Sequence, residues 1–197
     1  MPASALATVT ALNFSRLEPK GSPFARPLRP TDRPFLMDAL TRLWGDHALF
    51  DAESAVSVPG WWVLDRDGIR AAVWTRPRSW VMTRLPGAGG FLLKNLLSRL
   101  PYLGRVLSWP RFDFVHFQGG WCQPGREPEL LTLMEAVLAR HQRYIGIGYL
   151  DPESPLFQRL DALGRLGMLD RLVDRPRARI MTGHANLTGD QYADLER

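Results

Sequence analysis

The chain has a single cysteine, Cys122, and only two lysines among its 197 residues. One cysteine excludes an internal disulfide and any zinc site built on cysteine pairs. No run of about 18 apolar residues occurs, so we predict no membrane span. The first residues lack the basic region and apolar core of a secretory signal, and we therefore expect a cytoplasmic protein.

The positive charge is almost wholly arginine, with a formal net charge of +5. The arginines are spread along the chain, whereas nucleic-acid-binding proteins usually concentrate their basic residues in a stripe. We expect no nucleic-acid partner, and this charge favours an anionic small ligand such as a phosphorylated cofactor. We also predict no metal site, because Asp46, His47 and Asp51 do not have the spacing of a ligand pair.

Apolar spacing and turn signals predict strands alternating with helices in one domain spanning residues 1–197. Asp67-Gly68 predicts a hairpin turn, and Gly119-Gly120 is expected to end a strand. Residues 1–25 are expected to form an N-terminal arm or a loosely added strand, and 185–197 a C-terminal tail. The predicted helices are 31–44, 128–140 and 155–166, and the predicted strands are 61–64, 69–74, 79–83, 112–117, 143–150, 168–173 and 177–182.

A helical insert is predicted at 87–108, after the glycine-rich segment 87–90. Five leucines between Leu92 and Leu100 fall on one stripe, which indicates an amphipathic helix over Phe91–Leu107. Such a helix could complete the core, cover an acceptor site, form a homodimer surface or lie on a lipid surface. Trp80 and Trp109 flank the insert and are candidate lining residues of an apolar acceptor pocket.

This order of elements resembles the GNAT superfamily of N-acetyltransferases over roughly residues 26–182. The resemblance implies an α/β (α+β) fold, with a mixed central sheet flanked by helices and the insert placed before the fourth core strand. In that family the sheet opens after its fourth strand, and acyl-CoA lies in the opening. Here Phe112–Gln118 corresponds to that strand, Gly119–Glu127 to the turn that binds the pyrophosphate, and Pro128–Arg140 to the helix whose backbone N–H groups face it.

The family's turn has Gln or Arg, two residues, Gly, one residue, then Gly or Ala. Gly125 matches the first glycine, Cys122 falls at the leading position, and Glu127 falls at the last. A carboxylate at Glu127 repels a pyrophosphate unless Arg126 neutralises it. The resemblance implies acetyl-CoA or another acyl-CoA as co-substrate. Its binding residues would be Phe117, Gln118, Gly119, Gly120, Gln123, Gly125 and Arg126.

Two side chains in the fourth core strand are candidate catalytic bases. Strand alternation places His116 and Asp113 on opposite faces, and a histidine pKa lies near neutral pH. The alternative for His116 is a hydrogen-bonded residue that fills the sheet face. Cys122 is a candidate nucleophile, because a helix N-terminus stabilises a thiolate. The family's tyrosine acid has no counterpart, since no tyrosine occurs between Asp151 and Arg179.

The predicted function is acyl-CoA-dependent N-acyl transfer, with acetyl as the expected group, to a small-molecule or peptide amine. The amine would attack the thioester directly, with backbone N–H groups polarising its carbonyl. The alternative is a non-catalytic protein of the same fold that uses the helix at 91–107 for dimerisation or partner binding.

Overall fold

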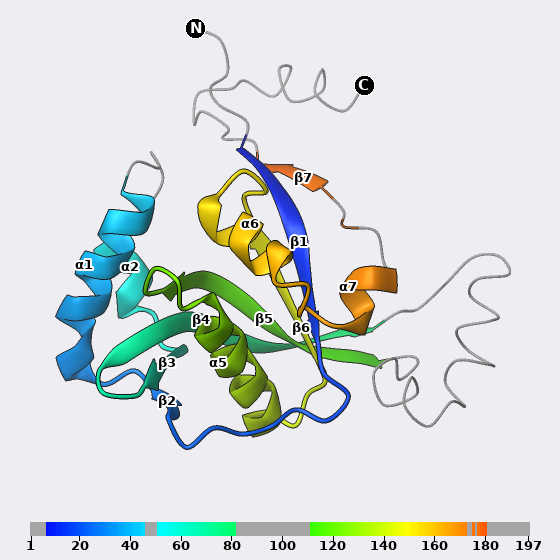
Figure 1. The fold of residues 1–197 in the computed structure, drawn as a ribbon, viewed down its shortest axis with the longest axis horizontal. Coiled ribbons are helices and arrows are strands. Elements are labelled where there is room, and N and C mark those ends of the chain that lie inside the picture. The colour runs from blue at the N-terminus through cyan, green and yellow to red at the C-terminus, as the bar shows by residue number, and fades with distance from the viewer. Residues whose placement is uncertain (1–6, 46–50, 82–110, 173–174, 176, 181–197) are drawn as a thin grey trace, which may run out of the picture.

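The computed structural model describes residues 7–45, 51–81, 111–172, 175 and 177–180 (Figure 1). The predicted insert at 87–108, its dimer surface at 91–107, Trp109 and the tail at 185–197 lie outside the described residues.

The centre of the fold is a seven-stranded mixed sheet, in the order β2-β3-β4-β5-β6-β1-β7. Among the described strands, β5 and β6 form the one parallel pair, and every other neighbouring pair is antiparallel. The mixed sheet flanked by helices agrees with the predicted fold class. The strands are β1 (Ala7–Ser15), β2 (Ala25–Pro27), β3 (Trp61–Asp65), β4 (Ile69–Val81), β5 (Arg111–Cys122), β6 (Ile145–Leu150) and β7 (Arg177–Ile180).

Helices cover both faces of this sheet. Helices α5 and α6 pack against the side chains of Leu12, Phe14, Val73 and Phe117, and both lie in front of the sheet in Figure 1. Helices α1 and α2 pack on the other face, against the alternate strand residues such as Val63 and Ala72. The helices are α1 (Arg33–Trp44, after a 3₁₀ turn at Pro30–Asp32), α2 (Ala52–Ser57), α5 (Glu127–Arg140), α6 (Pro155–Ala162) and α7 (Met168–Leu172).

Residues Ala7–Ser15 form an inner strand of the sheet, where the sequence predicted an arm or a loosely added strand. Strand β1 lies between β6 and β7 and pairs with both. Phe14 is fully buried, and Leu12 is 2% exposed in the main core. The pairing partners are more than 100 residues away in sequence, so no local pattern could indicate them.

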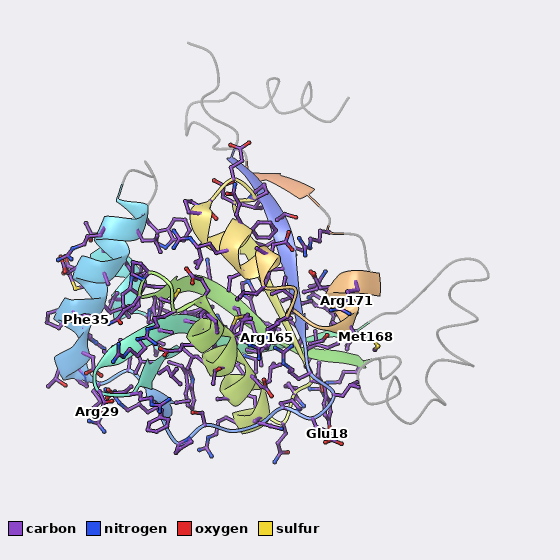
Figure 2. The ribbon with its side chains drawn as sticks, in the orientation of Figure 1. Glu18, Arg29, Phe35, Arg165, Met168 and Arg171 are labelled. Carbon is purple, nitrogen blue, oxygen red and sulfur yellow. The ribbon has the colours of Figure 1, made fainter. Side chains whose placement is uncertain are left out.

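Residues 168–172 form helix α7, which corrects the strand predicted at 168–173. Gly167 at φ +121° turns the chain close to β1: a Cβ there would lie 2.3 Å from the Ser15 carbonyl oxygen. The Ser15 hydroxyl then accepts a hydrogen bond from the Leu169 amide. This contact with β1 favours a helical turn where the short apolar run alone is ambiguous. Figure 2 shows Met168 and Arg171 at the opposite side of the molecule from Phe35 of α1.

Strand β4 runs without a break through Pro77, joining two strands that were predicted separately. Strand β3 begins at Trp61, opposite Trp74, so beyond Trp74 strand β4 pairs with β5 alone among the described residues. A proline is tolerated there because its missing N–H can face the unpaired side.

Candidate functional site

Strands β5 and β6 separate after a short parallel contact. Their pairing extends only from Val115 to Phe117, opposite Gly146 to Gly148. Beyond Phe117, β5 continues to Cys122 and pairs with β4 alone among the described strands. The opening therefore lies at the position that the resemblance implied.

A β-bulge at Gly119-Gly120 turns β5 at this opening. Gln118 pairs with Trp74 and Trp121 with Ala72, so two glycines lie opposite the single residue Val73. Gly119 has φ +61°, the left-handed conformation found in glycine bulges. The expected strand end is thus a bulge inside a longer strand, because glycine marks both features equally in sequence.

A narrow cavity of about 30 Å³ lies in the opening, between α5, α6 and the sheet. That volume has room for about two water molecules. Four of the seven predicted donor-binding residues line it: Phe117, Gln118, Gly119 and Gly120. The remaining wall is apolar and comes from β1, β4, β6, α5 and α6, with Leu12, Leu130, Leu156 and Leu160 among its residues.

The other three predicted donor residues lie in the turn between β5 and α5. The Arg126 amide donates to the Gln123 carbonyl at 2.9 Å, and Gly125 has φ +77°. With Pro124 before that glycine, the segment is a type II turn. Gln123 does not face the opening, because its side chain bonds Arg70 and the Ile69 carbonyl.

Glu127 occupies the N-terminus of α5. Its side chain is almost fully buried, and Oε1 lies 3.4 Å from the Gly125 amide and 2.9 Å from Arg159 Nη1. Burial raises the pKa of this carboxyl, but bonds from its own amide, Arg159 and Gly125 outweigh that effect and hold the pKa below its usual range. A resident carboxylate therefore fills the position expected for the donor's pyrophosphate.

The neutralising partner of Glu127 is Arg159, not Arg126. Arg126 is half-exposed and pairs with Glu129 at 3.4 Å. Arg159 lies on α6, 32 residues from Glu127. Sequence reasoning missed it, because only the packing of α6 beside α5 brings the two side chains together.

His116 lies on the sheet face opposite the cavity, with its imidazole partly buried. The rings of Trp74 and Tyr149 meet it edge-on, at centroid distances of 6.2 and 6.3 Å. Burial first, and then the positive charge of Arg78, lowers the pKa of His116 below its usual value of 6.5. The imidazole is therefore neutral at neutral pH and able to accept a proton.

Asp113 lies apart from His116, on the other face and toward the start of β5. Its carboxylate accepts hydrogen bonds from the Ser79 hydroxyl and from Arg111, and Arg143 lies 3.5 Å away. The Ser79 bond, followed by that of Arg111, holds the pKa of Asp113 below its usual range. Asp113 therefore belongs to an ion-pair cluster. Its lowered pKa makes it a poor acceptor of a proton.

Cys122 does not have the properties of a nucleophile. Burial, followed by the negative charge of Glu127, raises the pKa of its thiol to about 12. The thiol is therefore protonated at neutral pH, and only a thiolate reacts as a nucleophile. The helix terminus that was expected to stabilise the thiolate already holds Glu127.

No family model matches the chain, and no curated protein matches it. Solved structures with a similar fold include a Novosphingobium aromaticivorans protein described as a GNAT-family acetyltransferase, at 12% identity and a TM-score of 0.47. This match covers 82% of the present chain and 59% of that chain. Another is the Saccharomyces cerevisiae N-myristoyltransferase with bound myristoyl-CoA, at 9% identity and a TM-score of 0.49, covering 81% and 45% of the two chains. The chain thus spans less than two thirds of either protein.

Proposed function

We propose that this protein transfers an acyl group from acyl-CoA to an amine. The observation that carries the proposal is the separation of β5 and β6 at the glycine bulge. From Gln118 to Gly120 the β5 backbone borders the cavity; Gln118 pairs with Trp74 of β4, and the two bulge glycines have no paired residue among the described strands. Backbone groups on its other side are available to a pantetheine arm, which itself contains amides.

In the proposed reaction the amine nitrogen attacks the thioester carbonyl carbon, forming the C–N bond as the C–S bond breaks. The thioester would lie in the opening between β5 and β6, and the amine would reach it from the sheet face that carries His116, opposite the cavity. His116 would accept one proton from the amine and return it to the leaving thiolate, so that amide and free thiol are the products. Free backbone N–H groups beside the bulge would polarise the thioester carbonyl. The small cavity favours acetyl over a long acyl chain as the transferred group.

The proposal requires Glu127 to move when the donor binds. Two anions cannot share the N-terminus of α5 without strong repulsion. The donor's diphosphate would displace Glu127 and leave Arg159 as its cationic partner. Arg159 is 53% exposed, so its guanidinium can follow a ligand at the surface.

Isothermal titration with acetyl-CoA, together with thermal melting, tests the proposal. We expect heat of binding, a rise in Tm with ligand concentration, and release of free thiol when an amine is added. If neither the wild type nor Glu127→Ala binds at millimolar acetyl-CoA, the enzyme proposal is wrong. Octanoyl-CoA, compared with acetyl-CoA, tests the chain length.

The Glu127–Arg159 pair favours a second candidate function, a non-catalytic protein of the same fold. In that case the internal carboxylate permanently replaces the ligand anion and stabilises the turn. If neither the wild type nor Glu127→Ala binds acetyl-CoA, this candidate is supported. The predicted partner helix at 91–107 could then be tested by size-exclusion chromatography of a Leu93→Arg/Leu97→Arg variant, which should convert a dimer to a monomer.

A further inference from the structure

Two arginines of β4 lie beside His116 on the same face of the sheet. Arg76 pairs directly across from His116, and Arg78 pairs with Phe114 two residues along. Residues two apart on a strand share a face, and side chains that pair across strands have Cβ atoms about 5 Å apart. Both guanidinium groups can therefore reach a ligand held at His116.

Among the described residues, nothing on this face compensates the positive charge of these two arginines. Both side chains are exposed, and neither forms an ion pair with any residue in the described part of the chain. The residues that share the face on β4, β5 and β6 include no acid: Trp74, Trp80, Phe112, Phe114, Gln118, Ile145, Ile147 and Tyr149. By contrast, Arg111 and Arg143 on the other face both contact Asp113.

Aromatic rings border the charged group on both sides. Trp74 and Tyr149 contact the imidazole of His116, and Tyr149 is 44% exposed. Toward the start of β5, Trp80 packs on Phe114, with 4.5 Å between the centroids of the two rings, and the residue remains 50% exposed. A ligand on this surface would therefore meet two cations, a neutral imidazole and apolar rings.

We infer that the acceptor is an amine that carries a carboxylate close to its nitrogen, as an α-amino acid does. Arg76 and Arg78 bind the carboxylate, since guanidinium groups pair with carboxylates through two parallel hydrogen bonds. The amine then lies at His116, and an apolar side chain lies against Trp80. This inference rests on the proposed function, of which it names the substrate class.

Three matched pairs of amines test the inference, because each pair differs only by the carboxylate. The pairs are phenylalanine and phenethylamine, leucine and isoamylamine, and lysine and cadaverine. Thiol release is measured with acetyl-CoA as donor, and kcat and KM are determined for each amine. We expect the wild type to have at least a tenfold lower KM for the amino acid in one or more pairs. In the double variant Arg76→Gln/Arg78→Gln, the ratio of the KM of the decarboxylated amine to that of the amino acid should fall to about one.

Two further variants control for folding and for net charge. Arg42→Gln removes an exposed arginine of α1 that pairs with Asp38, and it should keep the wild-type ratio. Arg76→Lys/Arg78→Lys keeps the charge and should retain part of the preference, because lysine lacks the paired donors. Equal KM values within every pair for the wild type would overturn the inference while leaving the acyltransferase proposal intact.

Binding without donor separates the two proposals. Each amine is titrated against the tryptophan fluorescence of the protein, which Trp74 and Trp80 should make sensitive to this surface. Binding of an amino acid with at least tenfold preference over its decarboxylated partner supports the carboxylate site, even if acetyl-CoA fails to bind. Equal binding of both members of every pair, or binding of neither, overturns it.

Discussion

Arg159 Nη1 lies 2.9 Å from Glu127 Oε1, and this ion pair joins the middle of α6 to the first residue of α5. The carboxylate is nearly buried while the guanidinium is half-exposed. The pair therefore closes the α5 terminus with an anion that belongs to the protein, and a change at either residue should alter what else can bind there.

Glu127→Gln should bind acetyl-CoA about tenfold more tightly than the wild type, a change of about 1.4 kcal/mol. The substitution keeps the shape of the side chain and removes the charge that a diphosphate must displace. Isothermal titration measures the difference. Glu129→Gln is the matched control, since Glu129 also lies in the first turn of α5 but contacts Arg126 instead. Equal affinities for wild type and Glu127→Gln would contradict the assignment of this terminus as the diphosphate position.

Gly119→Ala should destabilise the protein by about 2–3 kcal/mol. The left-handed φ costs alanine about 1 kcal/mol, and the new Cβ would lie 2.9 Å from Cη2 of Trp61. Trp61 cannot easily yield, because it is 4% exposed and its indole N–H bonds the Ala55 carbonyl. Urea unfolding measures the loss.

Gly125→Ala isolates the contact with Trp61. Gly125 also has a positive φ, of +77°, but a Cβ there meets nothing within 4 Å. The free energy of unfolding of Gly125→Ala should therefore fall only by the cost of the left-handed backbone conformation, about 1 kcal/mol. If the two alanine variants were equally stable, the bulge would not depend on the packing of Trp61.

His116 should make stability depend on pH in the mildly acidic range, below about 6.5. Because its pKa is lowered in the folded state, the unfolded chain binds more protons between that value and about 6.5. Stability should therefore fall as the pH drops through this window and level off below the folded pKa. His116→Gln should reduce the slope without abolishing it, since the pKa of His141 is also lowered by burial.

Arg78→Gln should raise the pKa of His116, because the charge of Arg78 contributes to the lowering. Proton NMR titration of the imidazole measures the shift, and Arg42→Gln is the control. If His116 is the base, the pH midpoint of activity should move upward by the same amount. A moved imidazole pKa with an unmoved rate profile would show that another group accepts the proton.

Asp113→Asn should leave the rate of acyl transfer within about twofold of wild type, since the carboxylate lies on the opposite face from His116. The variant loses its pairing with Arg111 and Arg143, which are both partly exposed, so a loss of about 1 kcal/mol or less is expected. Paired measurements of kcat/KM and of urea unfolding test both statements. If the rate fell a hundredfold while the fold stayed intact, Asp113 would have to take part in the reaction.

Local signals in the sequence predicted local structure well. The Asp67-Gly68 turn joins β3 to β4, with both residues at positive φ. The helix predicted at 128–140 begins at Glu127 and ends at Arg140. These features depend on neighbouring residues, and their patterns are unambiguous.

Features that depend on distant residues were missed or misread. The place of β1 in the sheet depends on β6 and β7, and the Glu127–Arg159 pair depends on the packing of α6 beside α5. The Arg76–Arg78 surface was missed because residues 75–78 fell between two predicted strands, whereas β4 continues through them. The two glycines at Gly119-Gly120 indicate a local irregularity, but one sequence cannot distinguish a strand end from a bulge.

The position of β1 also affects how the protein can fold. Strand β6 pairs with β5 over only three residues. Its pairing with β1 on the other side is longer. During synthesis, β1 would therefore have no partner strand until more than 100 further residues had emerged from the ribosome. Such distant pairing slows folding and exposes strand edges to association with other copies. Refolding yield should consequently fall steeply as protein concentration rises, most of all when β1 is removed.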